Sequence, residues 1–314
     1  MRSQKKVRER KLLFMRQVYI VLITLAAWVA FSLMPQPLRS QQWRPVRGGI
    51  PFSISGMALL TEASGSTSFM VVHDNKQNER GRLAVITIKG EQLPQYFPVN
   101  WPTAIPLPAD LESLTVVPGT PEPTFMTATS AGKVYHFRWN ASKQTISIIK
   151  IFDLPNIVPG SNFEGFAVQK MDGQLLTVWA DRGQDQRPAV LYWGRLNLNT
   201  YQITPIGFVQ LKVPLPVAAV RHISDLKVDS AGVLFISSAA DNGDDGPFES
   251  AVYVAGAFDI REQQITFRPN AQLIPLYRYK YHKVEAIELI PGRNGGVIVG
   301  SDDENMGGSV YLNW

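Results

Sequence analysis

The sequence predicts an all-β fold, a five-bladed β-propeller preceded by one N-terminal transmembrane helix, and two observations carry this prediction. First, from residue 43 to residue 314, short runs of β-branched and aromatic residues are separated by Gly, Pro, Asn and Asp, which is typical of many short strands. Second, one unit recurs five times at spacings of 52 to 61 residues. A repeat of this period indicates a stacked or radial array of similar units.

Each unit opens on a short polar pair inside an alternating strand. The five pairs are Ser55-Gly56, Glu112-Ser113, Glu164-Gly165, Ser224-Asp225 and Glu285-Ala286. A turn follows, then apolar second strands are expected at 69–74, 125–130, 175–181, 233–239 and 297–302. After a loop, third strands are expected at 82–88, 133–139, 189–196, 251–257 and 309–314. Antiparallel strands in units of this size predict propeller blades.

The outer strands and the closure of the ring are less obvious. A weaker fourth strand is expected in four of the units, for example at 145–152 and 202–211. The last unit ends at Trp314 after its third strand, so residues 43–53 are expected to supply its outer strand. A ring of six blades and an open array of β-sandwiches are the alternatives.

The N-terminal segment predicts a membrane anchor. Residues 17–34 carry no charge, and this length is near the minimum for a helix that spans a bilayer. Residues 1–16 carry seven Lys or Arg and one Glu, so the positive-inside rule keeps this tail in the cytoplasm. A cleaved signal peptide is the alternative. Either way, residues 35–42 form a linker and residues 43–314 a propeller domain outside the cytoplasm, whether periplasmic, lumenal or extracellular.

Composition excludes several classes of site and partner. The chain has no cysteine, which removes disulfides, zinc–thiolate centres and cysteine nucleophiles. Beyond the basic tail, 24 Lys or Arg face 25 Asp or Glu, so no basic face and no nucleic-acid partner is expected.

The first residues of the five opening pairs predict a metal site. The first strand of each blade lines the central axis of a propeller, so five side chains are expected to converge: Ser55, Glu112, Glu164, Ser224 and Glu285. Three carboxylates so close together repel one another, and a hard cation removes that cost. Ca²⁺ accepts six to eight oxygen ligands in flexible geometry, whereas Mg²⁺ demands a strict octahedron. We therefore expect an axial Ca²⁺. The alternative is that each Glu binds backbone N–H groups of the neighbouring blade.

The loops that follow the second strands are expected on the same rim, and they are rich in acids. These loops are 73–81, 181–187, 241–250 and 301–308. If a cation polarises a phosphoryl group there, Asp74, Asp181 and Asp302 are the candidate bases for activating water. Interspersed Lys and Arg residues leave the rim mixed in charge, which suits a phosphate-containing ligand or a protein partner.

The ring order Ser, Glu, Glu, Ser, Glu resembles that of the calcium-activated nucleotidase (apyrase) family, five-bladed propellers with Ca²⁺ in the axial channel. Segments 69–90 and 287–312 are also similar to that family's Asp-rich turn and final acidic loop. Gly56 departs from the pattern, because the family has a second acid there, and we place no counterparts of its nucleotide-binding residues. The Glu-Gly blade start at 164–165 also resembles the wider esterase-like phytase group.

Two functions are therefore open. One is a membrane-anchored, extracytoplasmic propeller that holds axial Ca²⁺ and acts as a binding or assembly module. The other, implied by the resemblance, is a Ca²⁺-dependent phosphohydrolase or esterase of the apyrase or phytase type.

Overall fold

The computed structural model describes residues 43–312 except 64, 263 and 292–295. Residues 42–314 cluster as one compact unit. The predicted basic tail 1–16, membrane anchor 17–34 and linker 35–42 lie outside the described residues. Among the residues that are described, no helix is both long and apolar enough to cross a membrane.

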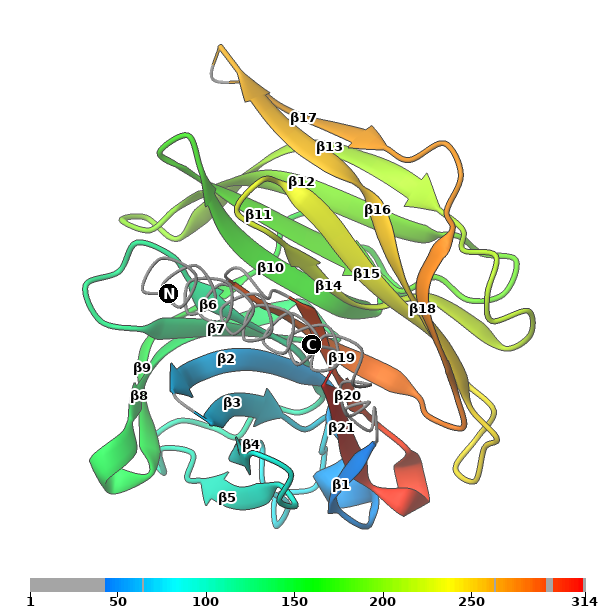
Figure 1. Ribbon diagram of the computed structural model, residues 1–314. Helices are drawn as coiled ribbons and strands as arrows, with labels where there is room; N and C mark the ends of the chain where they lie inside the picture. Colours follow the sequence, from blue (N-terminus) through cyan, green and yellow to red (C-terminus); the bar gives the residue numbers. More distant parts are fainter. Residues whose placement is uncertain (1–42, 64, 263, 292–295, 313–314) are drawn as a thin grey trace, which may run out of the picture. The chain divides into compact units, whose positions relative to one another are not determined.

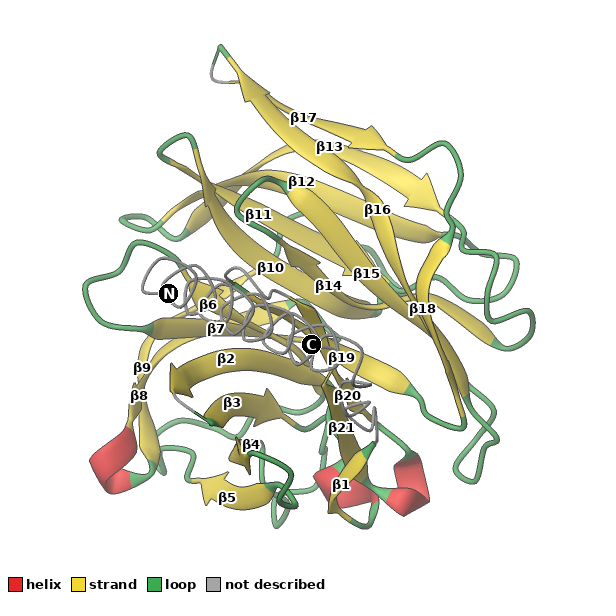
Figure 2. Cartoon of the chain, viewed as in Figure 1, coloured by secondary structure: helices red, strands yellow, loops and turns green. Residues whose placement is uncertain are grey.

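The described chain is all-β, with five separate antiparallel sheets (Figure 2). The first blade contains β2 (Gly56–Ala63), β3 (Ser66–Val72), β4 (Leu83–Lys89) and β5 (Gln95–Val99). The second contains β6 (Leu111–Val117), β7 (Thr124–Thr129), β8 (Lys133–Asn140) and β9 (Thr145–Asp153). The third contains β10 (Phe163–Met171), β11 (Gln174–Asp181), β12 (Ala189–Asn197) and β13 (Gln202–Leu211).

The last two blades depart slightly from four consecutive strands. The fourth contains β14 (Val220–Val228), β15 (Val233–Ala240), β16 (Glu249–Arg261), β17 (Gln264–Pro269) and β18 (Pro275–Lys280). The long β16 pairs with β17 along one stretch and with β18 along another, so two short strands share the outer position. The fifth contains β19 (Val284–Ile290), β20 (Gly296–Ser301), β21 (Gly308–Leu312) and β1 (Arg44–Arg47). Three short 3-10 helices accompany these strands: η1 (Ile50–Phe52), η2 (Ala141–Lys143) and η3 (Glu304–Met306).

The first strands of the blades form a closed ring. Contacts run from β2 to β6, β10, β14, β19 and back to β2, and these five strands lie at the centre of Figure 1. The prediction of a five-bladed β-propeller is therefore confirmed, and the six-bladed and open arrangements are excluded.

The N-terminal strand closes the last blade, as predicted from the missing outer strand. β1 runs antiparallel to β21, with Arg44 opposite Val310 and Pro45 opposite Ser309 (Figure 1). Trp43, just before β1, stacks on the imidazole of His282 with ring centroids 3.8 Å apart. Strand pairing and aromatic packing thus join the two ends of the domain.

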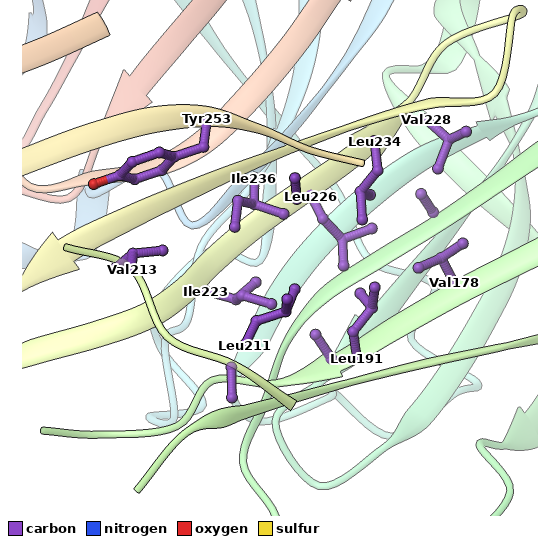
Figure 3. Close-up of a cluster of buried hydrophobic side chains, with 14 of the residues drawn as sticks. Val178, Leu191, Leu211, Val213, Ile223, Leu226, Val228, Leu234, Ile236 and Tyr253 are labelled. Carbon is purple, nitrogen blue, oxygen red and sulfur yellow. The ribbon is translucent and has the colours of Figure 1, made fainter. Parts of the chain in front are cut away.

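Apolar cores fill the spaces between neighbouring blades, including the space between the first and last blades. Figure 3 shows the core between the third and fourth blades, where Val178 and Leu191 face Ile223, Leu226 and Leu234. Each sheet is thus covered on both faces. This explains why the second strands read as continuous apolar runs rather than alternating ones.

A β-bulge marks the start of the inner strands. In β10, the residues on either side of Glu164 pair with consecutive residues of β11, which leaves Glu164 outside the ladder. Glu112 and Glu285 are left outside their ladders in the same way, and a longer slip in the fourth blade includes Ser224. The extra residue of a bulge is unpaired and its side chain is re-aimed. The three ring glutamates therefore occupy one structural position.

In two of the opening pairs the second residue is a glycine, at places where the next blade comes close. A Cβ at Gly56 would lie 2.8 Å from the Cα of Ser113 in the second blade. A Cβ at Gly165 would lie 2.7 Å from the side chain of Leu226 in the fourth blade. The absence of an acid after Ser55 therefore has a packing reason.

Candidate axial cation site

The rim at which the inner strands begin also carries the loops that follow the second strands. Neighbouring loops are hydrogen-bonded to one another there. Asp110 N donates to Asn75 O at 3.4 Å, joining the first two blades, and Asn305 Nδ2 donates to Asp245 Oδ1 at 2.9 Å, joining the last two. The prediction that opening pairs and acidic loops share one rim is confirmed.

All five predicted ring residues are buried: Ser55, Glu112, Glu164, Ser224 and Glu285. The three glutamates, from the second, third and fifth blades, interact electrostatically. The structure therefore brings together carboxylates that are far apart in the sequence.

Several ring oxygens lack protein partners. Ser55 Oγ, Ser224 Oγ and Glu164 Oε2 are buried with no hydrogen-bond partner among the described residues. Glu112 likewise forms no hydrogen bond or ion pair with the part of the chain that the structure describes. Leaving a buried polar atom unpaired costs roughly 1–3 kcal/mol. These oxygens are therefore available to a ligand that the polypeptide does not supply.

Besides Arg182, whose Nη1 donates to Glu164 Oε1 at 3.1 Å, two basic side chains, Arg221 and Lys283, reach the ring carboxylates. Arg221 Nη1 lies 2.6 Å from Glu285 Oε1 and 3.8 Å from Glu164 Oε1. Lys283 Nζ lies 3.3 Å from Glu285 Oε1, and only 1% of its side chain is exposed. Burial alone would lower the pKa of both bases, but the surrounding carboxylates outweigh it and raise both pKa values, so both remain charged.

On the side of the first two blades, the side chains of Glu112 and Asp74 form no hydrogen bond or ion pair within the described ranges, although the neighbouring Asp110 is paired with Lys76 at 2.9 Å. Burial, together with the charges of Glu164 and Asp110, raises the pKa of Glu112 well above its usual range. Burial and the charges of Asp302 and Asp110 raise the pKa of Asp74 to about 7. These two carboxyl groups therefore keep their protons to a higher pH than a free carboxylic acid does.

The other two candidate bases differ in their surroundings. Burial opposes ionisation of Asp302, but the Lys283 ammonium at 3.1 Å dominates and lowers the pKa of Asp302 to about 2. Asp181 is ion-paired with Arg187 and accepts hydrogen bonds from Asn162 N at 2.9 Å and Gly183 N at 3.0 Å. Asp302 is therefore an ionised carboxylate next to Lys283, whereas Asp181 stabilises the loop in which it lies.

Acids that bind the backbone of the neighbouring blade do exist, but not at the ring positions. Asp225 Oδ2 accepts from Ile287 N at 2.8 Å, and Glu288 Oε2 accepts from Leu59 N at 3.2 Å. Each of these bonds joins two adjacent inner strands. The structural role considered above for the ring glutamates is thus performed by acids further along the strands.

On the side of the ring away from the rim, the side chain of Lys227 crosses the axis of the propeller. Its Nζ, on the fourth blade, donates to Leu114 O on the second blade at 2.6 Å and lies 3.6 Å from Asp225 Oδ2. These two blades are not neighbours in the ring, so the bond spans the channel. Beyond it lies a hollow of about 600 Å³ lined by all five inner strands, with Lys227 and Glu288 among its residues. The ring therefore opens toward the rim only.

Whether the ring suits a metal ion depends on which of its oxygen atoms remain without hydrogen-bond donors among the described residues. No group of three or more His, Asp or Glu within the described residues is arranged to hold a metal ion. This agrees with the engagement of Glu285 by Arg221 and Lys283. Four residues keep oxygens without protein donors: Ser55, Glu112, Glu164 and Ser224. Two carboxylates and two hydroxyls form an oxygen donor set, which fits a hard cation completed by water.

Arg221 and Lys283 were not identified as site residues by the sequence reasoning. A signal was present, because each lies two or three residues before a ring residue, at the rim end of an inner strand. Arg221 precedes Ser224 and Lys283 precedes Glu285, so each basic residue is positioned by the same stretch of chain as a ring residue.

The domain is thus a five-bladed β-propeller with an acid-rich axial site that opens toward one rim. No family model matches the chain, and no curated protein matches it. Solved structures with a similar fold include the endo-arabinanase of Bacillus licheniformis, at 13% identity and a TM-score of 0.49, covering 86% of this chain and 97% of that one.

Two further structures are similar. The endo-arabinase of Bacteroides thetaiotaomicron shares 8% identity at a TM-score of 0.47, covering 87% of this chain and 98% of that one. The α-L-arabinanase of Penicillium chrysogenum shares 11% identity at a TM-score of 0.43, covering 86% and 96%. At such identities the likeness concerns the fold alone.

Proposed function

We propose that the propeller is a binding module that holds Ca²⁺ in its axial ring, with Ser55, Glu112, Glu164 and Ser224 as the direct ligands. The observation that carries the proposal is the set of buried ring oxygens left without partners among the described residues. A cation would satisfy these oxygens and offset the burial and the carboxylate repulsion that together raise the pKa of Glu112.

Within this proposal Glu285 contributes charge rather than a direct bond. Its carboxylate is already held by Arg221 and Lys283. Four protein residues leave coordination positions for water, which suits the six to eight ligands of Ca²⁺ better than the strict octahedron of Mg²⁺. Direct coordination by Glu285 requires Arg221 to withdraw.

The rim around the ion is the surface that meets a ligand or partner. Ca²⁺ and the nearby guanidinium of Arg182, which donates to Glu164 Oε1 at 3.1 Å, together suit a phosphate-containing ligand or an acidic protein segment. The anchoring of this module to a membrane by residues 17–34, with the propeller outside the cytoplasm, is part of the same proposal.

Calcium binding is tested with the full-length protein in detergent. After treatment with chelator, the protein is dialysed against CaCl₂, and bound calcium and the melting temperature are measured. A ligand at 100 times its Kd stabilises the native state by about 2.7 kcal/mol. Glu164→Gln is expected to abolish most of this gain. Glu122→Gln, whose partner is the exposed Arg138, is the matched control. Equal melting temperatures in calcium and in chelator would refute the proposal.

A second candidate function is a Ca²⁺-dependent phosphohydrolase, the activity implied by the resemblance to calcium-activated nucleotidases. The observation that favours it is the pair Asp74 and Asp302, which share the rim and whose pKa values are displaced in opposite directions. Acid and base roles are often assigned by such a separation. Asp74, with a pKa near neutral pH, is the better base. Asp181 and Asp302 are disfavoured by their ion pairs with Arg187 and Lys283.

Release of phosphate from nucleotides and phosphate esters, with calcium or chelator, tests this activity. Chelator-sensitive turnover that Asp74→Asn lowers at least 100-fold is the expected result for a hydrolase. Absence of turnover by a protein that binds calcium leaves the binding module as the function.

A further inference from the structure

Arg221 is the basic side chain that links the ring to the rim. Its Nη1 lies 2.6 Å from Glu285 Oε1, while its Nε and Nη2 lie 3.1 and 2.8 Å from Asp241 Oδ2. Asp241 follows β15 at the rim, and 26% of its side chain is exposed. One guanidinium therefore bridges a buried ring carboxylate and a carboxylate at the surface.

We propose that Arg221 is an internal counter-ion that sets the cation affinity of the ring, releasing Glu285 and remaining on Asp241 when a divalent cation binds. This inference rests on the proposed calcium site. The guanidinium and the cation are attracted by the same two carboxylates, Glu164 and Glu285, so each weakens the binding of the other.

The geometry favours movement of Arg221 over movement of Lys283. Asp241 already holds Arg221 through two nitrogen atoms, so only the contacts of Nη1 with Glu285 and, at 3.8 Å, with Glu164 have to break. Lys283 Nζ is surrounded by Glu285, Asp302 and Glu304, and its backbone N donates to Asp303 Oδ1 at 2.9 Å. Of its three acceptors only Glu304 reaches the surface, so withdrawal of Lys283 toward Glu304 would leave two buried carboxylates, Glu285 and Asp302, without its charge.

The counter-ion also determines which cations enter the ring. A guanidinium delivers its charge through directed hydrogen bonds to carboxylates. A monovalent ion brings no more charge than the group it displaces, whereas Ca²⁺ brings twice as much. Arg221 therefore selects for divalent cations.

The experiment measures CaCl₂ affinity by titration calorimetry on the full-length protein in detergent. Arg221→Met is expected to bind Ca²⁺ at least tenfold more tightly than the wild type, a change of about 1.4 kcal/mol. Arg278→Met removes a cation whose partner is Glu249, away from the ring, and is expected to leave the affinity unchanged. Equal or weaker binding by Arg221→Met overturns the inference. Absence of calcium binding by both the wild type and Arg221→Met overturns the proposed site itself.

A second variant tests the transfer to Asp241 and does not depend on folding of Arg221→Met. Asp241→Asn removes the surface acceptor, so Arg221 stays with Glu285 and calcium affinity is expected to fall three- to tenfold. Asp244→Asn removes one charge from the same loop, but Asp244 forms no hydrogen bond or ion pair with Arg221 among the described residues, so its effect is expected to be smaller.

In the Arg221→Met background, Asp241→Asn is expected to lose most of its effect, because neighbouring groups that act together show non-additive changes. An unchanged affinity in Asp241→Asn, or equal effects of Asp241→Asn and Asp244→Asn, overturns the transfer.

Discussion

Replacement of Gly56 by alanine tests how closely the inner strands of the first two blades approach. The added Cβ would lie 2.8 Å from both Cα and C of Ser113 and 2.9 Å from Leu114 N. Ordinary van der Waals contact begins at 3.4 Å, so the strands would have to separate by roughly 0.6 Å, in a region where the packing is too dense to yield freely. Overpacking of this kind costs about 1–3 kcal/mol, and we expect the upper part of that range because the obstacle is backbone.

Two further glycine variants calibrate this result. At Gly165 the obstacle is the side chain of Leu226, which can change rotamer, so alanine there is expected to cost less than at position 56. At Gly81 nothing lies within 4 Å of the added atom, and stability is expected to change by less than about 0.5 kcal/mol. Free energies of unfolding from urea titrations rank the three glycine variants by their loss of stability. If Gly56→Ala were as stable as Gly81→Ala, the close approach of the two blades would be refuted.

Two other predictions concern the carboxylate cluster and the closing strand. The pKa of Asp74 is raised from 3.8 to about 7 in the native state. Between these pH values the native state therefore holds a proton that the unfolded chain has released. In chelator, the free energy of unfolding should thus fall as the pH rises from 5 to 7, by up to about 1.4 kcal/mol per pH unit. Asp74→Asn should flatten this slope in urea titrations at pH 5, 6 and 7, and an unchanged slope would show that another group is responsible. Trp43→Ala removes the stacking on His282 and should cost about 3 kcal/mol in the free energy of unfolding. Tyr281→Ala, at a side chain that is 68% exposed, is its control, and equal losses would argue that Trp43 does not stabilise closure.

Much of the fold is predictable because the same packing requirements recur in each of the five blades. Each blade needs an apolar second strand covered on both faces, and two of the inner strands need a glycine, Gly56 or Gly165, where the next blade comes close. The missing outer strand of the last blade was predictable for a different reason, since an unpaired edge must be satisfied and only residues 43–53 were left to do so.

The division of the outer position in the fourth blade was not predictable. The sequences of β17 and β18 are each typical of a short strand. Both can pair with β16 because β16 is unusually long. Pairing partners far apart along one strand leave no local pattern in the sequence.

The positions of the ring glutamates followed from the repeat, whereas their partners did not. Glu112, Glu164 and Glu285 share a bulge, which a repeat alignment detects. Arg221 occurs only in the fourth blade and acts across blade boundaries on Glu164 and Glu285, and Lys283 occurs only in the fifth blade, where it pairs with acids of that blade. Single substitutions of this kind are invisible to a search for recurring residues, although they decide the charge of the site.

Lys227, which joins the fourth and second blades below the ring, has a consequence for kinetics. The side chain of Lys227 and its bond to Leu114 O cross the axis on the side of the ring away from the rim. If an ion binds in the ring as proposed, its residence time is therefore expected to depend on the rim loops rather than on passage through the propeller. Loop substitutions that touch no ligand would alter the rates of entry and departure together, and would leave the equilibrium affinity in place.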